Sequence, residues 1–133
     1  FRGERDKVSF VTQLPTRIGS GGLYMVSLEL QLDGNGRRMV WKYVPLNAGM
    51  QDFSALDRQA QEVILVGAEL SDIEDIWLRY FGVLGAGQAP IWVERWESDT
   101  SLPSLIRIQV RMADGGDSPD FVVAPMLMSE LVR

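Results

Sequence analysis

The strongest constraint on the fold is a period-two alternation of apolar and polar residues over residues 23–32. One side of the extended segment carries Tyr24, Val26, Leu28, Leu30 and Leu32, and the other carries Met25, Ser27, Glu29 and Gln31. Asp33-Gly34-Asn35-Gly36 follows, and Asx-Gly pairs adopt the positive φ angles that tight hairpin turns need. Residues 38–44 then alternate again, with Met39, Trp41 and Tyr43 on one side. The sequence therefore predicts a β-hairpin over residues 23–44.

Other short segments have the same strand-like character. They cover residues 8–13, 63–66, 75–81, 91–96, 105–112 and 121–124, with turns rich in Gly, Pro and Asp between them. Residues 54–62 contain the one plausible helical turn, with Ser54 as its cap. This pattern predicts a mainly β fold with antiparallel strands, two packed sheets and at most one or two short helical turns. We expect these core residues to be buried: Tyr24, Val26, Leu28, Leu30, Ile106, Ile108 and Val110.

Length and charge limit the classes of protein further. The 133 residues, 46% hydrophobic and 23% charged, predict a single globular domain over residues 1–133. The net charge of −5 argues against binding nucleic acid through its phosphates and against docking on an anionic membrane. No stretch approaches the ~20 continuous apolar residues of a membrane span. The chain opens at Phe1 without an initiator Met, which we interpret as a fragment of a longer protein.

The chain contains neither cysteine nor histidine, and this excludes several kinds of catalysis. Zinc–thiolate sites and nucleophiles activated by histidine cannot be built. Asp72, Glu74 and Asp75 are the candidate paired carboxylates for acid–base work. Because neighbouring residues of a strand point to opposite faces, we expect Glu74 and Asp75 to diverge and interpret the group as a solvated bend. We predict that the protein is not an enzyme and has no cofactor.

Two clusters of oxygen-bearing residues resemble calcium loops. Asp33-Gly34-Asn35-Gly36 has Val44 where an EF-hand places its last glutamate, so we favour the hairpin turn. Asp114, Asp117 and Asp120 form the second cluster, which we interpret as an exposed turn, with calcium binding as the alternative.

Tryptophan and methionine side chains supply the candidate binding surfaces. Trp77, Trp92 and Trp96 fit core or subunit packing, and a carbohydrate-stacking platform is the alternative. Trp92 and Trp96 share a face if their strand is unbroken. The apolar tail after Pro125 either packs on the sheet or meets a partner. The candidate partner interface consists of Trp77, Trp92, Trp96, Met126 and Met128.

Several segments, in order along the chain, resemble the J-type minor pseudopilins, also called type II secretion protein J. The middle of the chain carries the best match, in which Glu62-Val63-Ile64-Leu65-Val66-Gly67-Ala68 resembles a Leu-Leu-x-Gly-Val stretch of that family. The other similar segments are Phe1-Arg2-Gly3, residues 8–12, residues 21–28, residues 75–81, the paired tryptophans in residues 92–96, and residues 102–108 with Leu102-Pro103.

The resemblance implies a mechanical role without a catalysed reaction or a cofactor. The full-length subunit would be anchored in the inner membrane by an N-terminal helix that this chain lacks, giving a pilin-like α+β fold. Its periplasmic head would sit at the tip of the pseudopilus with I- and K-type minor pseudopilins, helping folded exoproteins to cross the outer membrane. The alternative is a carbohydrate- or ligand-binding β-sandwich that uses exposed tryptophans.

Overall fold

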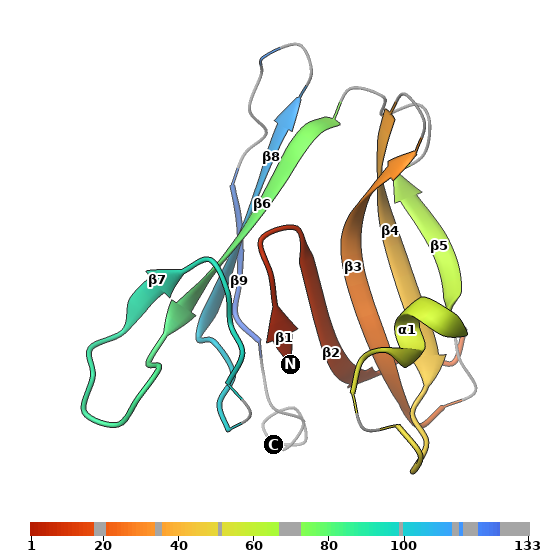
Figure 1. Ribbon diagram of the computed structural model, residues 1–133, viewed down its shortest axis with the longest axis horizontal. Coiled ribbons are helices and arrows are strands. Elements are labelled where there is room, and N and C mark those ends of the chain that lie inside the picture. The colour runs from red at the N-terminus through yellow and green to blue at the C-terminus, as the bar shows by residue number, and fades with distance from the viewer. Residues whose placement is uncertain are drawn as a thin grey trace.

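The computed structural model describes residues 1–17, 21–33, 36–50, 52–66, 73–98, 100–112, 115 and 120–125. These residues form two antiparallel sheets, which confirms the predicted fold class (Figure 1). The five-stranded sheet has the order β1 (Arg2–Gly3), β2 (Lys7–Gln13), β3 (Leu23–Asp33), β4 (Gly36–Pro45) and β5 (Gln61–Val66). The four-stranded sheet has the order β7 (Ile91–Val93), β6 (Ile73–Gly82), β8 (Leu105–Met112) and β9 (Phe121–Val123).

The predicted hairpin is formed by β3 and β4. Leu28 pairs with Trp41 near its middle, and Asp33 pairs with Gly36 at its end. Gly34 and Asn35 themselves lie outside the described residues. The pairing confirms the hairpin interpretation of this segment.

The helical turn is shorter than the predicted span. It forms α1 (Ala55–Arg58), and residues 61–62 belong to β5 instead. Ser54 occupies the N-cap position without a capping hydrogen bond from its side chain. Its backbone N–H donates to Asp52 Oδ1 at 2.9 Å, and its Oγ accepts from Arg58. The hydrogen bonds from Ser54 hold the pKa of Asp52 below its ordinary value.

Both faces of β3 are covered, which the alternation alone did not indicate. Tyr24 and Val26 are buried on the side of the sheet that faces β6 and β8. On the other side α1 lies over β3 and β4, where Met25 packs with Val44 and Leu56 (Figure 1). The polar side of β3 is therefore part of the interior as well.

A buried ion cluster fills the polar part of that second face. Lys42 Nζ lies 2.9 Å from Glu29 Oε1, and Lys7 Nζ lies 3.3 Å from Glu29 Oε2. Burial by itself raises the pKa of Glu29, but hydrogen bonds from Gln31 and Lys42 and the charge of Lys7 outweigh it, so the pKa is lowered. Burial by itself lowers the pKa of Lys42, but Glu29 outweighs it, so that pKa is raised.

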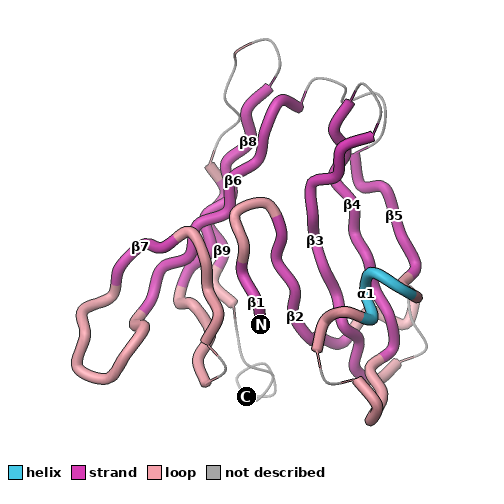
Figure 2. The backbone as a smooth tube through the Cα atoms, in the orientation of Figure 1, coloured by secondary structure: helices cyan, strands magenta, loops and turns pink. Residues whose placement is uncertain are grey.

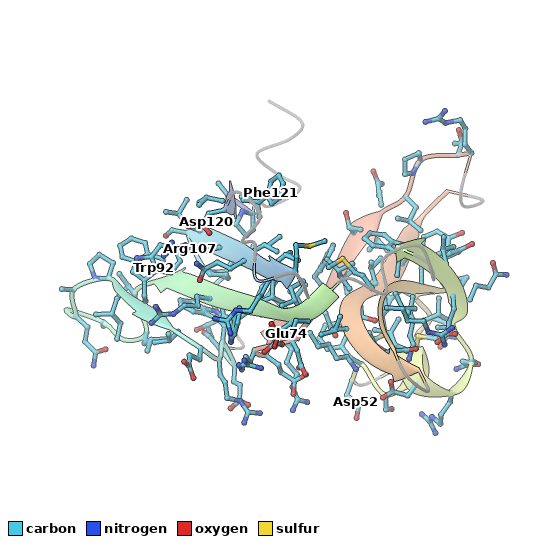
Figure 3. All side chains as sticks on the ribbon, turned by 90° about the horizontal axis from the view of Figure 1, so that it is seen from above. Asp52, Glu74, Trp92, Arg107, Asp120 and Phe121 are labelled. Atoms are coloured by element: carbon cyan, nitrogen blue, oxygen red, sulfur yellow. The ribbon has the colours of Figure 1, made fainter. Side chains whose placement is uncertain are left out.

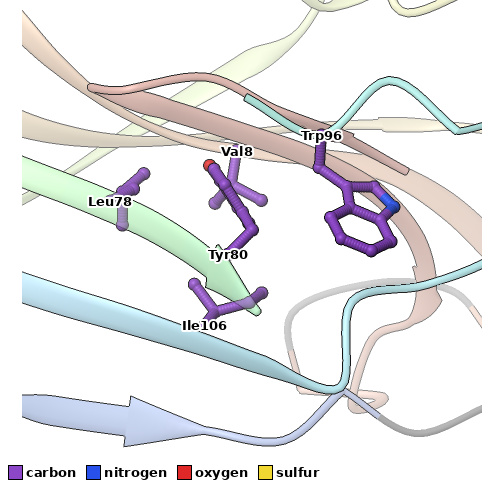
Figure 4. Packing of buried hydrophobic residues seen from close by; sticks show 5 residues of the cluster. All are labelled: Val8, Leu78, Tyr80, Trp96 and Ile106. Carbon is purple, nitrogen blue, oxygen red and sulfur yellow. The ribbon is translucent and has the colours of Figure 1, made fainter. Parts of the chain in front are cut away.

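The main core lies between the two sheets. It contains Val8, Leu78, Tyr80, Trp96 and Ile106 (Figure 4). The hydroxyl of Tyr80 donates to the carbonyl of Glu4 at 2.6 Å, and burial raises the pKa of Tyr80 above its ordinary value. This hydrogen bond ties β6 to the turn between β1 and β2.

The residues predicted to be buried separate into two groups. Tyr24, Val26 and Ile106 are buried as expected. Leu28, Leu30, Ile108 and Val110 are only half-buried, which corrects the prediction. For Leu28 and Ile108 the reason is that both line an open groove between the sheets.

The two sheets are joined at β1. Gly3 and Trp96 exchange two backbone hydrogen bonds of 2.8 Å each, and the N–H of Leu78 donates to the carbonyl of Arg5 at 2.7 Å. Figure 2 shows the loop after β7 running back beside β1. The strand predicted over residues 91–96 therefore ends at Val93, because Trp96 pairs with Gly3 instead of β6.

Candidate partner interface

The four-stranded sheet presents an outer face that mixes aromatic rings with arginines. Because Leu78 and Tyr80 point into the core, Trp77, Arg79 and Phe81 point away from it. Residues paired across neighbouring strands share a face. Trp77 pairs with Gln109, Arg79 with Arg107, and Phe81 with Trp92. We call this set, with Arg111, the outer face: Trp77, Arg79, Phe81, Trp92, Arg107, Gln109 and Arg111.

An exposed apolar patch lies at the β6–β7 hairpin. The ring of Trp92 is 37% exposed and lies 5.2 Å from the ring of Phe81, measured between centroids, at an angle of 42°. Val83, Leu84 and Ile91 beside it are also exposed. We call Val83, Leu84, Ile91 and Trp92 the hairpin patch. Its aliphatic members were not predicted as surface residues, although the pair Val83-Leu84 between glycines is a signal for them.

The ring of Trp77 contacts the charged groups of two arginines. The guanidinium carbon of Arg5 lies 5.1 Å from the centre of the Trp77 ring, and that of Arg111 lies 4.7 Å from it. These distances are typical of cation–π contacts. Arg5 also donates to Asp75 at 2.9 Å.

Around this ring lies a groove of about 390 Å³, which we call the Arg–Trp groove. Its aromatic and charged lining residues are Arg5, Trp77, Arg79, Glu94, Arg111 and Asp120. The residues come from the β1–β2 turn, β6, the segment after β7, β8 and the residue before β9. Sequence reasoning singled out Trp77 but missed the arginines, because their convergence depends on the register of β6 and β8.

Asp120, one member of the second candidate calcium cluster, is paired with an arginine. Arg107 Nε lies 3.0 Å from Asp120 Oδ2, and Arg107 Nη2 contacts the same oxygen. Figure 3 shows the two side chains together on the four-stranded sheet. The hydrogen bond from Arg107 holds the pKa of Asp120 below its ordinary value.

Asp120 is the only one of the three aspartates of the second candidate calcium cluster that the structure describes. Asp114 and Asp117 lie outside the described residues. Within the part of the chain that the structure describes, no group of three or more His, Cys, Asp or Glu residues is arranged to hold a metal ion.

Trp96 is removed from the candidate interface by its burial. Its side chain is 0% exposed and lies in the core, and its indole N–H donates to the carbonyl of Ser101 at 3.0 Å. Because β7 ends at Val93, Trp92 and Trp96 do not share a strand face. Trp77 and Trp92 do share the outer face, whereas Met126 and Met128 lie outside the described residues.

Of the three candidate paired carboxylates, the structure describes Glu74 and Asp75. Asp72 lies outside the described residues. Glu74 is exposed, and Asp75 accepts hydrogen bonds from Arg5 and from the N–H of Ile76. The β6–β8 pairing is irregular between Ile73 and Asp75, so simple alternation does not describe this end of β6.

An apolar groove of about 660 Å³ lies between the sheets. The side chains of Val8, Phe10 and Trp41 line it from one sheet, and those of Ile106 and Ile108 line it from the other. Val123 of β9 borders it, and all three residues of β9 are exposed, with Phe121 at 56%. Alternation along single strands did not predict this groove, since it arises from how the two sheets meet.

Comparison with known proteins gives one informative similarity. The chain is 28% identical over 127 residues to the type II secretion system protein J of Xanthomonas campestris pv. campestris, and the alignment covers 93% of this chain. The chain spans 56% of the length of that curated relative, a little over half. This similarity confirms the resemblance to type II secretion protein J that the sequence motifs indicated. No protein-family model matches the chain.

Among the described residues, no helix is both long enough and apolar enough to span a lipid bilayer.

Proposed function

We propose that this chain is the periplasmic head of a minor pseudopilin of the type II secretion system, with a structural role and no catalytic one. The observation that carries the proposal is the similarity to type II secretion system protein J over 93% of the chain. The two antiparallel sheets fit the β-rich head that the resemblance implies. Residues 1–133 act as one head domain, and the full-length subunit is held in the inner membrane by a preceding helix.

We infer that the head works by contacting other minor pseudopilin heads, those of the I and K types, at the tip of the pseudopilus. The exposed ring of Trp92 and the exposed aliphatic side chains of the hairpin patch support this part of the proposal. Tryptophan and arginine are enriched in protein–protein interfaces, and Trp92 and Arg111 are exposed representatives of these types. In the full-length proteins, packing between the membrane helices adds to the contacts between heads.

Gene deletion tests the proposed function in the source bacterium. We expect loss of the full-length gene to leave secreted exoproteins in the periplasm, and a plasmid copy to restore their release into the medium. A periplasmic marker enzyme serves as the control for leakage. Unchanged release of exoproteins from the deletion strain would contradict the proposal.

A further inference from the structure

Two arginines of the outer face have no carboxylate partner in the described residues. Arg5 is paired with Asp75 and Arg107 is paired with Asp120. Within the described part of the chain, neither Arg79 nor Arg111 has a carboxylate oxygen within the 4.0 Å of an ion pair. The Nε of Arg79 is buried without a hydrogen-bond partner there. In a chain with a net charge of −5, these two cations are available to an external anion.

The contact with Trp77 orients one of these cations for binding. The guanidinium group of Arg111 lies over the ring, 4.7 Å from its centre. The N–H groups of a guanidinium lie in its plane and donate to a carboxylate in pairs. Trp77 therefore limits the rotamers of Arg111 and reduces the entropy that binding would cost.

The sheet register places Arg79 beside a like charge, whereas Arg111 stands opposite Asp75, a carboxylate already paired with Arg5. Arg79 stands directly opposite Arg107 across β6 and β8. Like charges at this position destabilise a sheet unless they are neutralised. Asp120 neutralises Arg107, and no described carboxylate does so for Arg79.

We propose that the Arg–Trp groove binds an extended acidic segment of a partner protein, with carboxylates on Arg79 and Arg111. This inference rests on the proposed function, since it names the chemistry by which the head recognises a neighbour. Arg111 lies four residues along β8 from the position opposite Arg79, which is roughly 13 Å in a strand. In an extended peptide, two acidic residues four positions apart have the same spacing and point to the same side.

The test is peptide binding measured by fluorescence anisotropy. The probe is a labelled peptide of β-forming residues with two glutamates four positions apart, and the matched peptide has glutamines there. We expect the intact chain to bind the glutamate peptide at least about tenfold more tightly, because a glutamine amide has no charge and only one acceptor oxygen for the paired arginine donors. Binding should weaken as NaCl is raised. Equal binding of both peptides would overturn the proposal.

Arginine variants test whether the peptide binds in the Arg–Trp groove. Arg79→Gln with Arg111→Gln should weaken binding of the glutamate peptide about tenfold or more. The matched control is Arg2→Gln with Arg58→Gln, which removes the same charge from exposed positions away from the groove and should stay within about twofold. Equal losses in the two double variants would show nonspecific attraction and overturn the proposal. Thermal unfolding checks that both variants are folded.

Three further outcomes separate the alternatives. If free glutarate shifts the NMR signal of the Trp77 indole N–H with the affinity of the peptide, the site binds small carboxylates and the peptide proposal fails. If gene deletion blocks secretion but the peptide does not bind, only the groove proposal fails. If the peptide binds but deletion leaves secretion intact, only the proposed function fails.

Discussion

Gly3 lies against the ring of Tyr80 with no room for a side chain between them. A Cβ added to Gly3 would come less than 3.0 Å from three atoms of that ring. The ring cannot move aside at low cost, because it is fully buried and its hydroxyl donates to the carbonyl of Glu4 at 2.6 Å. Gly3 also pairs with Trp96, so this contact lies where the two sheets join.

Replacing Gly3 by alanine should therefore destabilise the fold. We expect Gly3→Ala to lower the free energy of unfolding by about 2–3 kcal/mol, the range for overpacking a core. Gly49→Ala is the matched control, since its nearest neighbour is Asn47 Oδ1 at 3.4 Å, and it should change stability by no more than about 0.5 kcal/mol. Urea unfolding of both variants measures the difference, and equal effects would refute this account of the junction.

The hydroxyl of Tyr80 should stabilise the fold separately from the packing of its ring. Tyr80→Phe removes the donor to Glu4 and leaves a carbonyl without that partner. We expect a loss of about 1–2 kcal/mol in unfolding free energy. Tyr43→Phe is the control, because the Tyr43 hydroxyl bonds the exposed side chain of Gln61, where water can replace it. A smaller loss for Tyr80→Phe than for Tyr43→Phe would contradict the assignment.

The ion cluster under α1 predicts how stability depends on pH. The pKa of Glu29 in the folded state lies below its ordinary value of 4.5, so its stabilisation is present above that pH and is lost as the pH falls through the folded pKa. The pKa of Lys42 lies above 10.5, so its contribution is present below that pH and is lost as the pH rises through the folded pKa.

The Glu29→Gln variant tests how stability depends on pH in the acidic range. At neutral pH the change leaves Lys42 without its closest carboxylate, and we expect a loss of about 3 kcal/mol. The difference between the variant and the unmodified chain should shrink as the pH falls below 4.5 and through the lowered pKa of Glu29 in the folded state. Asp57→Asn, at an exposed carboxylate of the same cluster, should change stability by less than about 1 kcal/mol. A difference that is constant between neutral pH and pH 3 would exclude the proposed linkage.

Replacing each of the two tryptophans near β7 should change stability by very different amounts. Trp96→Ala leaves a cavity in the core and should cost about 3–5 kcal/mol of stability. Trp92→Ala removes an exposed ring and should cost much less, while weakening any contact made by the hairpin patch. Thermal unfolding of the two variants gives the order, and the reverse order would contradict their placement.

Local patterns predicted most of the fold, and contacts between distant segments account for what they missed. The alternation around Tyr24 and the Asx-Gly turn were enough to predict β3, β4 and their hairpin, because register follows from side-chain period and turn length. The spacing of Trp92 and Trp96 suggested one face, but a bridge to Gly3 turns Trp96 into the core. Only tertiary structure determines that pairing.

The candidate interface also depends on contacts that local sequence patterns do not predict. Trp77 and Trp92 were singled out by residue type, and their shared face follows from the register of β6 with β7 and β8. The position of Arg5 beside Trp77 depends on the turn between β1 and β2, far away in the sequence. The alternation of apolar and polar residues within a single strand does not predict such a contact.

The proposed function predicts that this chain, as a minor pseudopilin head, assembles with other heads. Sedimentation velocity of the chain mixed with cognate I- and K-type heads tests it most directly. We predict a pairwise or ternary species at high micromolar concentration, as expected of a small interface, and its weakening by Trp92→Ala with the fold intact. The absence of any complex at that concentration would contradict the claim.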